Sequence, residues 1–173
     1  IYVLTETGNT SVCLPPCEHL PGRARLHAAG RPYPGVQATI RDADGNELPA
    51  GMSGEVYLKS PAQMLEYFGD PTATANTIVD GWIRTGDVGY LDEDGFLVIR
   101  DRVKDLIIIA GENVYPAEVE KAINSHPCVH DSAVVGAPDE RRGERIQAFV
   151  VAEPGSTLQF EDLDRFLIQR LAR

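Results

Sequence analysis

The chain has 173 residues and a hydrophobic content of 43%, which is enough to build one large domain or two small ones. Its 16 Lys and Arg against 26 Asp and Glu give a formal net charge of −10, which argues against a nucleic-acid partner because such a surface must be cationic. No run approaches the ~18 apolar residues of a membrane span, and the three Cys form no even disulfide framework. We therefore expect a cytoplasmic protein, in a reducing setting, without a transmembrane segment.

Short strands joined by tight turns are predicted for the first hundred residues, which hold 20 of the 28 Gly and Pro residues. Asp44-Gly45 and Asp94-Gly95 each border a strand-like run, and Asp-Gly is a hairpin signal because Gly accepts the positive φ of the turn. The strand-like runs span residues 36–41, 54–58, 88–91 and 96–100. This pattern predicts a small antiparallel sheet or barrel.

After residue 102 the sequence pattern changes from short strand-like runs alone to helices and strands together. Pro116 fits the first turn of a helix over residues 116–125, in which Val119 and Ile123 lie four apart on one face. Two strand-like runs and a second amphipathic helix follow, at residues 132–136, 146–152 and 160–171. Because helix, strand, strand, helix is a small α+β module, we place a domain boundary between Asp101 and Lys104.

Two polar clusters in the first hundred residues each allow a nucleotide-binding and a purely structural interpretation. In Tyr2-Val3-Leu4-Thr5-Glu6-Thr7-Gly8, a hydroxyl beside a carboxylate could hold a phosphate oxygen and a magnesium ion, or the Thr could cap a strand end. In Arg84-Thr85-Gly86-Asp87, the Asp lies on a Gly-flanked turn. It could accept two hydrogen bonds from a cis-diol such as a ribose, or form an ordinary Asx turn.

Two further clusters follow in the second half of the chain. Asp101-Arg102-Val103-Lys104-Asp105 alternates in charge, which is typical of a solvated linker, yet its Arg could bind an anionic or hydroxylated ligand. The charged stretch 136–144 is typical of a surface turn between two strands.

In their order and spacing these clusters resemble the motifs of the adenylate-forming superfamily, the AMP-dependent ligases that include acyl-CoA synthetases, luciferases and the adenylation domains of peptide synthetases. Tyr2-Val3-Leu4-Thr5-Glu6 resembles its Tyr-Gly-x-Thr-Glu motif, with Val3 in place of Gly, and Arg84-Thr85-Gly86-Asp87 is its ribose-binding motif. Further matches are residues 30–35, residues 54–56, the hinge motif over residues 101–120, and residues 135–144. Residues 111–116 are most similar to fatty-acid-type acyl-CoA synthetases.

The resemblance implies a nucleotide site. Tyr2 would stack on adenine, and Thr5 would contact the α-phosphate. Glu6 would help to hold Mg²⁺. Asp87 would bind both ribose hydroxyls, with Arg102 assisting.

The resemblance also implies a domain organisation. Residues 1–103 would be the C-terminal, β-rich part of the large AMP-binding domain, and residues 104–173 an incomplete small lid domain. Lys104 would be the hinge about which the small domain rotates between adenylation and thioester formation. Gly111 would line the tunnel for the pantetheine arm of CoA.

The implied function of the whole protein is that of an acid–CoA ligase, which activates a carboxylic acid, fatty or related, as acyl-AMP with ATP and Mg²⁺ and transfers it to CoA. The family's phosphate loop and catalytic Lys fall outside the 173 residues, so we expect a piece of a longer protein that is inactive alone. Two alternatives stay open: a luciferase-like or peptide-synthetase adenylation domain, and a non-catalytic folded fragment with residual nucleotide or partner binding. The identity of the acid and the oligomeric state are not indicated.

Overall fold

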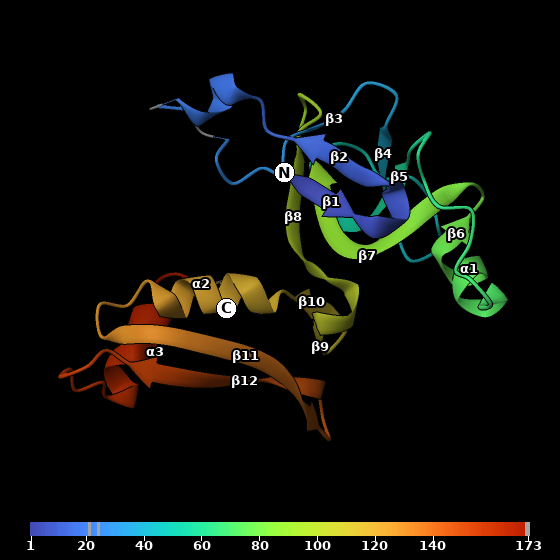
Figure 1. Cartoon of the computed structure of the whole chain (residues 1–173). Helices are drawn as coiled ribbons and strands as arrows, with labels where there is room; N and C mark the ends of the chain where they lie inside the picture. The colour runs from blue at the N-terminus through green and yellow to red at the C-terminus, as the bar shows by residue number, and fades with distance from the viewer. Residues whose placement is uncertain (21, 24, 172–173) are drawn as a thin grey trace. The chain divides into compact units, whose positions relative to one another are not determined.

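The computed structural model describes residues 1–20, 22–23 and 25–171 (Figure 1). The chain divides into two compact units, residues 1–103 and residues 104–173. The elements of the first unit are β1 (Tyr2–Leu4), η1 (Thr5–Thr7), β2 (Asn9–Cys13), η2 (Pro16–His19), β3 (Arg31–Pro32), β4 (Gln37–Arg41), β5 (Gly54–Lys59), α1 (Pro71–Thr77), β6 (Ile78–Val79), β7 (Trp82–Leu91) and β8 (Leu97–Arg102). Those that follow are η3 (Val103–Asp105), β9 (Ile107–Ile109), β10 (Glu112–Val114), α2 (Pro116–Asn124), β11 (Val129–Asp139), β12 (Gly143–Ala152) and α3 (Phe160–Ile168).

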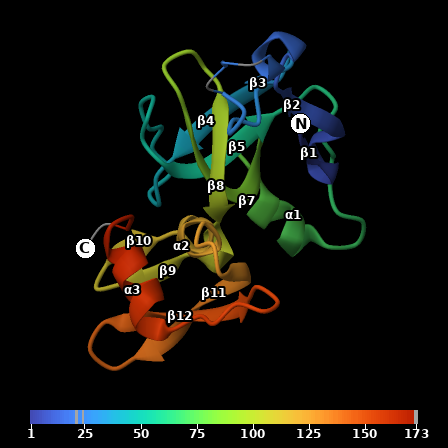
Figure 2. The ribbon, with the colours of Figure 1, turned by 90° about the vertical axis from the view of Figure 1, so that its left-hand side faces the viewer.

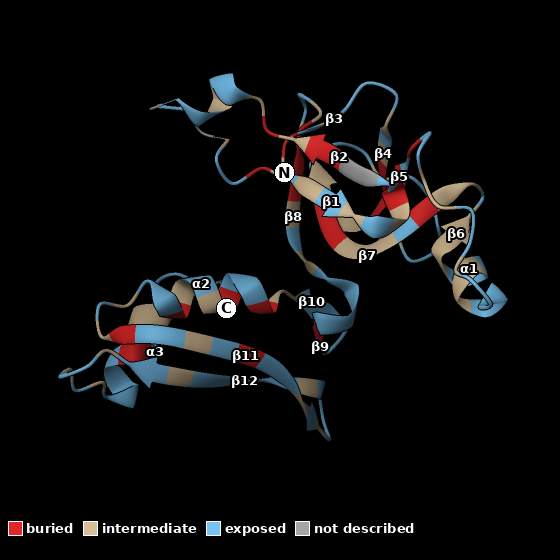
Figure 3. Ribbon diagram, in the orientation of Figure 1, coloured by how far each residue is buried: buried red, intermediate tan, exposed pale blue. Residues whose placement is uncertain are grey.

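The first unit consists of two antiparallel sheets. One has the order β1-β2-β3, and the other has the order β4-β5-β7-β6 with β8 also paired to β7. Their apolar faces meet in a core of buried aliphatic residues, and the buried positions concentrate on β2, β5, β7 and β8 (Figure 3). The members of this core are Val12, Ile40, Val56, Leu58 and Leu97. Both β1 and β8 contribute residues to this core or pack against it.

The second unit is a four-stranded antiparallel sheet, ordered β10-β9-β12-β11, with α2 and α3 on one of its faces (Figure 2). Val119 and Ile123 of α2 and Leu163 of α3 are buried against the sheet. The sheet contributes Ile107, Val129 and Val134 to the same core. The predicted four-residue spacing therefore does produce the buried stripe of α2.

The predicted α+β class, with antiparallel strands, is confirmed. Two local predictions for the second unit were wrong. The surface turn expected over residues 136–144 is limited to residues 140–142, because β11 and β12 pair as far as Asp139 with Gly143. The second helix ends at Ile168 rather than near residue 171.

Several short elements of the described chain were not predicted, among them α1, whose N-terminal Asp70 accepts the Ala73 N–H at 2.8 Å. Within the part of the chain that the structure describes, no helix is long and apolar enough to cross a membrane.

Candidate functional site

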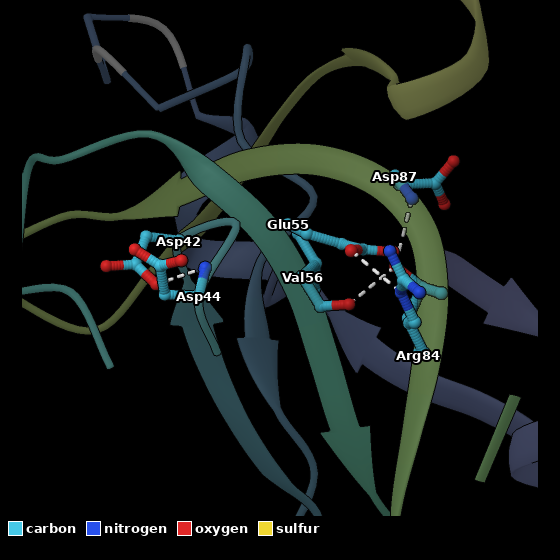
Figure 4. A network of polar contacts seen from close by, with 7 residues as sticks. Asp42, Asp44, Glu55, Val56, Arg84 and Asp87 are labelled. Carbon is cyan, nitrogen blue, oxygen red and sulfur yellow. Dashed lines mark hydrogen bonds and ion pairs between the residues drawn. The ribbon is translucent and has the colours of Figure 1, made fainter. Parts of the chain in front are cut away.

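Residues 84–87 form a bulge in β7 rather than the Gly-flanked turn expected from the sequence. Tyr57 of β5 pairs with Arg84 and Glu55 pairs with Val88, so residues 85–87 face Val56 alone. The Thr85 hydroxyl donates to the Val56 carbonyl at 2.7 Å and accepts the Asp87 N–H at 3.1 Å. Gly86 has the positive φ of 74° that such a bulge favours. The bulge turns the Asp87 carboxylate away from the strand pair (Figure 4).

Arg84 of the same motif serves as a clamp between strands. Its Nε lies 2.9 Å from both carboxylate oxygens of Glu55 (Figure 4). This hydrogen-bonded contact raises the pKa of Arg84 above its usual value. The guanidinium therefore fixes β7 to β5 immediately before the bulge.

The structure brings Tyr2, Asp87 and Arg102 together from three strands. The Tyr2 hydroxyl donates to Asp87 Oδ2, and Arg102 Nε lies 3.5 Å from Asp87 Oδ1. The Asp87 side chain is 14% exposed and that of Arg102 is 63% exposed. An ionised carboxylate offers about four acceptor positions, so two contacts leave capacity for two more hydrogen bonds, such as those of a diol.

Tyr2 is fixed in the role of donor. Burial, and after it the hydrogen bond to Asp87, raises the pKa of Tyr2 far above its usual value of 10.0. The phenol therefore keeps its proton at physiological pH. Its ring packs against the apolar core of the first unit. This packing fixes the position of the hydroxyl that donates to Asp87.

Thr5 and Glu6 begin the single 3₁₀ turn η1, which follows β1 directly. Gly8 ends this turn with a φ of 78°, and its N–H donates to the Thr5 carbonyl at 3.1 Å. A Cβ at position 8 would lie 2.0 Å from the Ala62 carbonyl oxygen, so Gly8 allows the loop at residues 60–69 to approach. Thr5 is exposed and Glu6 is half-buried.

Tyr67 joins this site although no motif marks it in the sequence. Its hydroxyl donates to Glu6 Oε1 at 2.7 Å. This hydrogen bond raises the pKa of Tyr67, so the phenol is the donor. Because the two residues are 61 positions apart, no local pattern indicates the contact.

Glu6 alone does not make a metal cage. Among the residues that the structure describes, no group of three or more His, Cys, Asp and Glu side chains could enclose a metal ion. Mg²⁺, however, is usually bound by one or two carboxylates together with substrate phosphates and water. Among the described residues Glu6 Oε2 accepts no hydrogen bond and makes no ion pair, so this carboxylate fits a magnesium ion that arrives with a nucleotide.

Lys104 and Gly111, the predicted hinge and tunnel residues, belong to the second unit. Lys104 is exposed in the short turn η3. Gly111 is exposed at the tip of the β9–β10 hairpin, where Ala110 and Gly111 have φ values of 52° and 89° between the paired Ile109 and Glu112. Two positive φ values are typical of a type I′ turn.

The comparisons with known proteins cover both units. One family model, AMP-binding enzyme, matches residues 1–68, and another, AMP-binding enzyme C-terminal domain, matches residues 118–173. The fatty acid–[acyl-carrier-protein] ligase ScoC of Streptomyces coeruleorubidus is 59% identical over 99% of this chain and 33% of its own length. A long-chain-fatty-acid–CoA ligase of Bacillus subtilis is 43% identical over 87% of this chain and 27% of its own length.

A solved structure shares the fold over almost the entire chain. The o-succinylbenzoate CoA synthetase (MenE) of Bacillus subtilis, in complex with the acyl-adenylate intermediate OSB-AMP, has a TM-score of 0.87. It is 37% identical, and the match covers 98% of this chain and 34% of that one. This chain spans about a third of the length of the relatives it matches, at 33% and 27% of the two ligases.

Proposed function

The chain belongs to the adenylate-forming AMP-binding enzymes, and on this premise we propose that the whole protein is an acid–thiol ligase. It activates a carboxylic acid as acyl-AMP with ATP and then passes the acyl group to a thiol. The proposal rests chiefly on the Asp87 carboxylate. Tyr2 and Arg102 hold this carboxylate in place, and its oxygens can still accept further hydrogen bonds. The names of the two relatives, both fatty-acid ligases, support a fatty or related acid as the substrate.

In this proposal the first unit holds the nucleoside. The carboxylate of Asp87 accepts hydrogen bonds from both ribose hydroxyls, because it is acceptor-only and its two contacts within the described chain leave capacity for two more. Arg102, which is mostly exposed, assists from the edge of β8. The aromatic ring of Tyr2 stacks on the adenine.

Adenylation proceeds by attack of the substrate carboxylate on the α-phosphorus of ATP, with pyrophosphate as the leaving group. The Thr5 hydroxyl donates a hydrogen bond to an α-phosphate oxygen, on which negative charge develops. Glu6 would supply a carboxylate ligand to Mg²⁺, which when bound would offset part of the charge of the phosphates. Such prearranged groups stabilise the transition state electrostatically. The step replaces the oxide of a carboxylate by AMP, which is a far better leaving group.

The second half-reaction uses the second unit. A thiolate attacks the acyl carbonyl carbon, and AMP departs with the bonding electron pair. We assign residues 1–103 to the large domain and residues 104–173 to the small domain. Lys104 is the hinge about which the small domain rotates between the two half-reactions. Gly111 lines the path of the pantetheine thiol, since a side chain at the tip of that hairpin would stand in its way.

CoA is the proposed acceptor, and a carrier protein is the second candidate. Residues 111–116 favour CoA by their similarity to acyl-CoA synthetases, whereas the relative at 59% identity is an acyl-carrier-protein ligase. Both acceptors present the same pantetheine thiol, so both need the open space that the absence of a side chain at Gly111 leaves. We place the reaction in the reducing cytoplasm, in keeping with free thiols at Cys13, Cys17 and Cys128.

The test uses the whole protein that contains this chain. Purified enzyme is assayed for acid-dependent exchange of labelled pyrophosphate into ATP across short, medium and long fatty acids and aromatic acids. We expect exchange with at least one fatty acid. Absence of exchange with every acid overturns the proposal. Thioester formation is then followed with CoA and, separately, with a purified acyl carrier protein, and the faster acceptor decides between the two candidates.

A further inference from the structure

The contact between Tyr67 and Glu6 joins two segments that meet at several points. The Tyr67 hydroxyl donates to Glu6 Oε1 at 2.7 Å, and the Met64 N–H donates to the Glu6 carbonyl at 2.8 Å. Gly8, whose missing side chain leaves space for Ala62, brings the same loop close to η1. The Glu6 backbone and side chain are therefore both held by the loop at residues 60–69.

Tyr67 is itself held in place by the helix that follows it. Its backbone N–H donates to Thr74 Oγ1 at 2.9 Å, and the Thr74 hydroxyl donates to the Asp70 carbonyl at 2.8 Å. Asp70 in turn accepts the Ala73 N–H at the start of α1. Tyr67 thus projects from a loop that a helix terminus braces, which limits the positions that its hydroxyl can reach.

The position of this hydrogen bond has a consequence for the carboxylate. A free Glu side chain rotates about several bonds, and its two oxygens exchange places. With Oε1 occupied by the phenol, Glu6 presents Oε2 in one orientation. A carboxylate that binds a metal ion through one oxygen commonly accepts a hydrogen bond from the protein at its other oxygen. Removal of such a hydrogen-bond donor weakens metal affinity roughly 10–100-fold.

We propose that Tyr67 is a positioning residue, which holds one oxygen of Glu6 so that the other meets the magnesium ion of the bound Mg–ATP. This inference rests on the proposed function. It adds a residue that none of the matched motifs contains. It also gives the loop before α1 a part in adenylation, because Met64, Tyr67 and Thr74 together determine where the Glu6 carboxylate lies.

The test measures the Mg²⁺ dependence of ATP binding to the whole protein by isothermal titration calorimetry, without turnover. Tyr67→Phe removes only the hydroxyl of a half-buried ring. The variant is expected to need about tenfold more Mg²⁺ for half-maximal tightening of ATP binding. ATP affinity in the presence of a chelator is expected to stay unchanged. Tyr90→Phe is the matched control, because Tyr90 lies in the same unit but packs against a different apolar cluster, that of Phe96 and Val98. This variant should behave as wild type.

Two further variants distinguish positioning of the Glu6 carboxylate by Tyr67 from a purely structural role of Tyr67. Glu6→Gln should raise the Mg²⁺ requirement, and adding Tyr67→Phe to it should have little further effect, because both changes act on one interaction. Thr74→Ala loosens the Tyr67 backbone while it keeps the phenol, and we expect a smaller rise of the same kind.

An unchanged Mg²⁺ requirement in Tyr67→Phe overturns the inference, and so does a lower melting temperature with normal Mg²⁺ dependence. Additive effects of Glu6→Gln and Tyr67→Phe would also contradict it. The proposed function is judged separately by pyrophosphate exchange of the wild-type enzyme, so failure of one is distinguishable from failure of the other.

Discussion

The carboxylate of Glu144 lies over Gly136, on the neighbouring strand of the second unit. A Cβ at position 136 would be 2.5 Å from Glu144 Oε1. The other oxygen, Oε2, accepts the Ile108 N–H at 2.6 Å. Together with the Ala110 N–H, which donates to the Arg142 carbonyl at 2.8 Å, this contact attaches the β9–β10 hairpin to β12. The absence of a side chain at position 136 thus helps to place the hairpin that carries Gly111.

Glu144→Ala should loosen this hairpin without unfolding the unit. Loss of one charge-assisted hydrogen bond is expected to lower the local opening free energy at Ile108 by roughly 1.5 kcal/mol, which accelerates its amide hydrogen exchange about tenfold. Exchange measured by nuclear magnetic resonance checks this. Glu144→Gln keeps an acceptor oxygen and should retain most of the protection. Equal exchange rates in wild type and Glu144→Ala would show that Oε2 does not protect this amide.

Thr85→Val should destabilise the first unit because it removes both hydrogen bonds that shape the bulge of β7. The Val56 carbonyl and the Asp87 N–H each lose a partner, and we expect the free energy of unfolding to fall by about 1–3 kcal/mol. Thr39→Val is the matched control with the opposite sign. Thr39 Oγ1 is buried and has no hydrogen-bond partner within the described part of the chain. Its removal should therefore be neutral or stabilising by about 1 kcal/mol. Urea unfolding compares the two, and equal losses would contradict the assigned role of Thr85.

Asp87→Ala should weaken ATP binding by roughly 1.5–3 kcal/mol, the range for hydrogen bonds to a charged group. The variant also leaves the Tyr2 hydroxyl and Arg102 without their common acceptor, so thermal stability should be recorded alongside. Calorimetric titration with ATP gives the affinity. Glu93→Ala, an exposed carboxylate in the β7–β8 turn, should leave it unchanged. Wild-type affinity in Asp87→Ala would mean that Asp87 is only a structural residue of the bulge.

Gly111→Leu should leave adenylate formation intact and block thioester formation. Within its own unit a Cβ at position 111 meets nothing within 4 Å, but the φ of 89° is unfavourable for Leu. Gly95→Leu controls for that strain, because Gly95 also has a positive φ of 78° and open space around it. Pyrophosphate exchange and thioester formation from purified acyl-adenylate measure the two steps. Equal loss of both in Gly111→Leu would indicate misfolding and count against the tunnel role.

Lys104→Pro should separate the half-reactions in the whole protein. Proline locks φ near −65°, and it disfavours the helical conformation of the preceding Val103, which is the first residue of η3. Domain rotations need a few loop positions whose φ and ψ can change widely. We expect adenylation within about tenfold of wild type, or ~1.4 kcal/mol of barrier, and thioester formation slower by orders of magnitude. Lys104→Ala keeps the backbone free and should retain both steps. Normal thioester formation in Lys104→Pro would exclude position 104 as the hinge.

The sequence by itself determined the family and the features that local physics encodes. The ordered motifs indicated the adenylate-forming superfamily, and the two family models and the relatives confirm that the chain belongs to it. Asp94-Gly95 predicted the β7–β8 hairpin, because Gly after Asp between two apolar runs readily takes the positive φ of a hairpin turn. The spacing of Val119 and Ile123 predicted α2, because the period of an α-helix places them on one face.

The tertiary structure alone decided how the site is assembled. Residues 84–87 have the composition of a turn, yet pairing with β5 makes them a bulge whose partner, Val56, is 29 positions from Thr85. Tyr2 and Asp87 are 85 positions apart, and Glu6 and Tyr67 are 61 apart. A local pattern reports backbone preference and burial, but which side chains meet depends on strand register and on where loops return. For this reason the sequence predicted Asp87 and Glu6 as ligands but not the phenol that holds each of them.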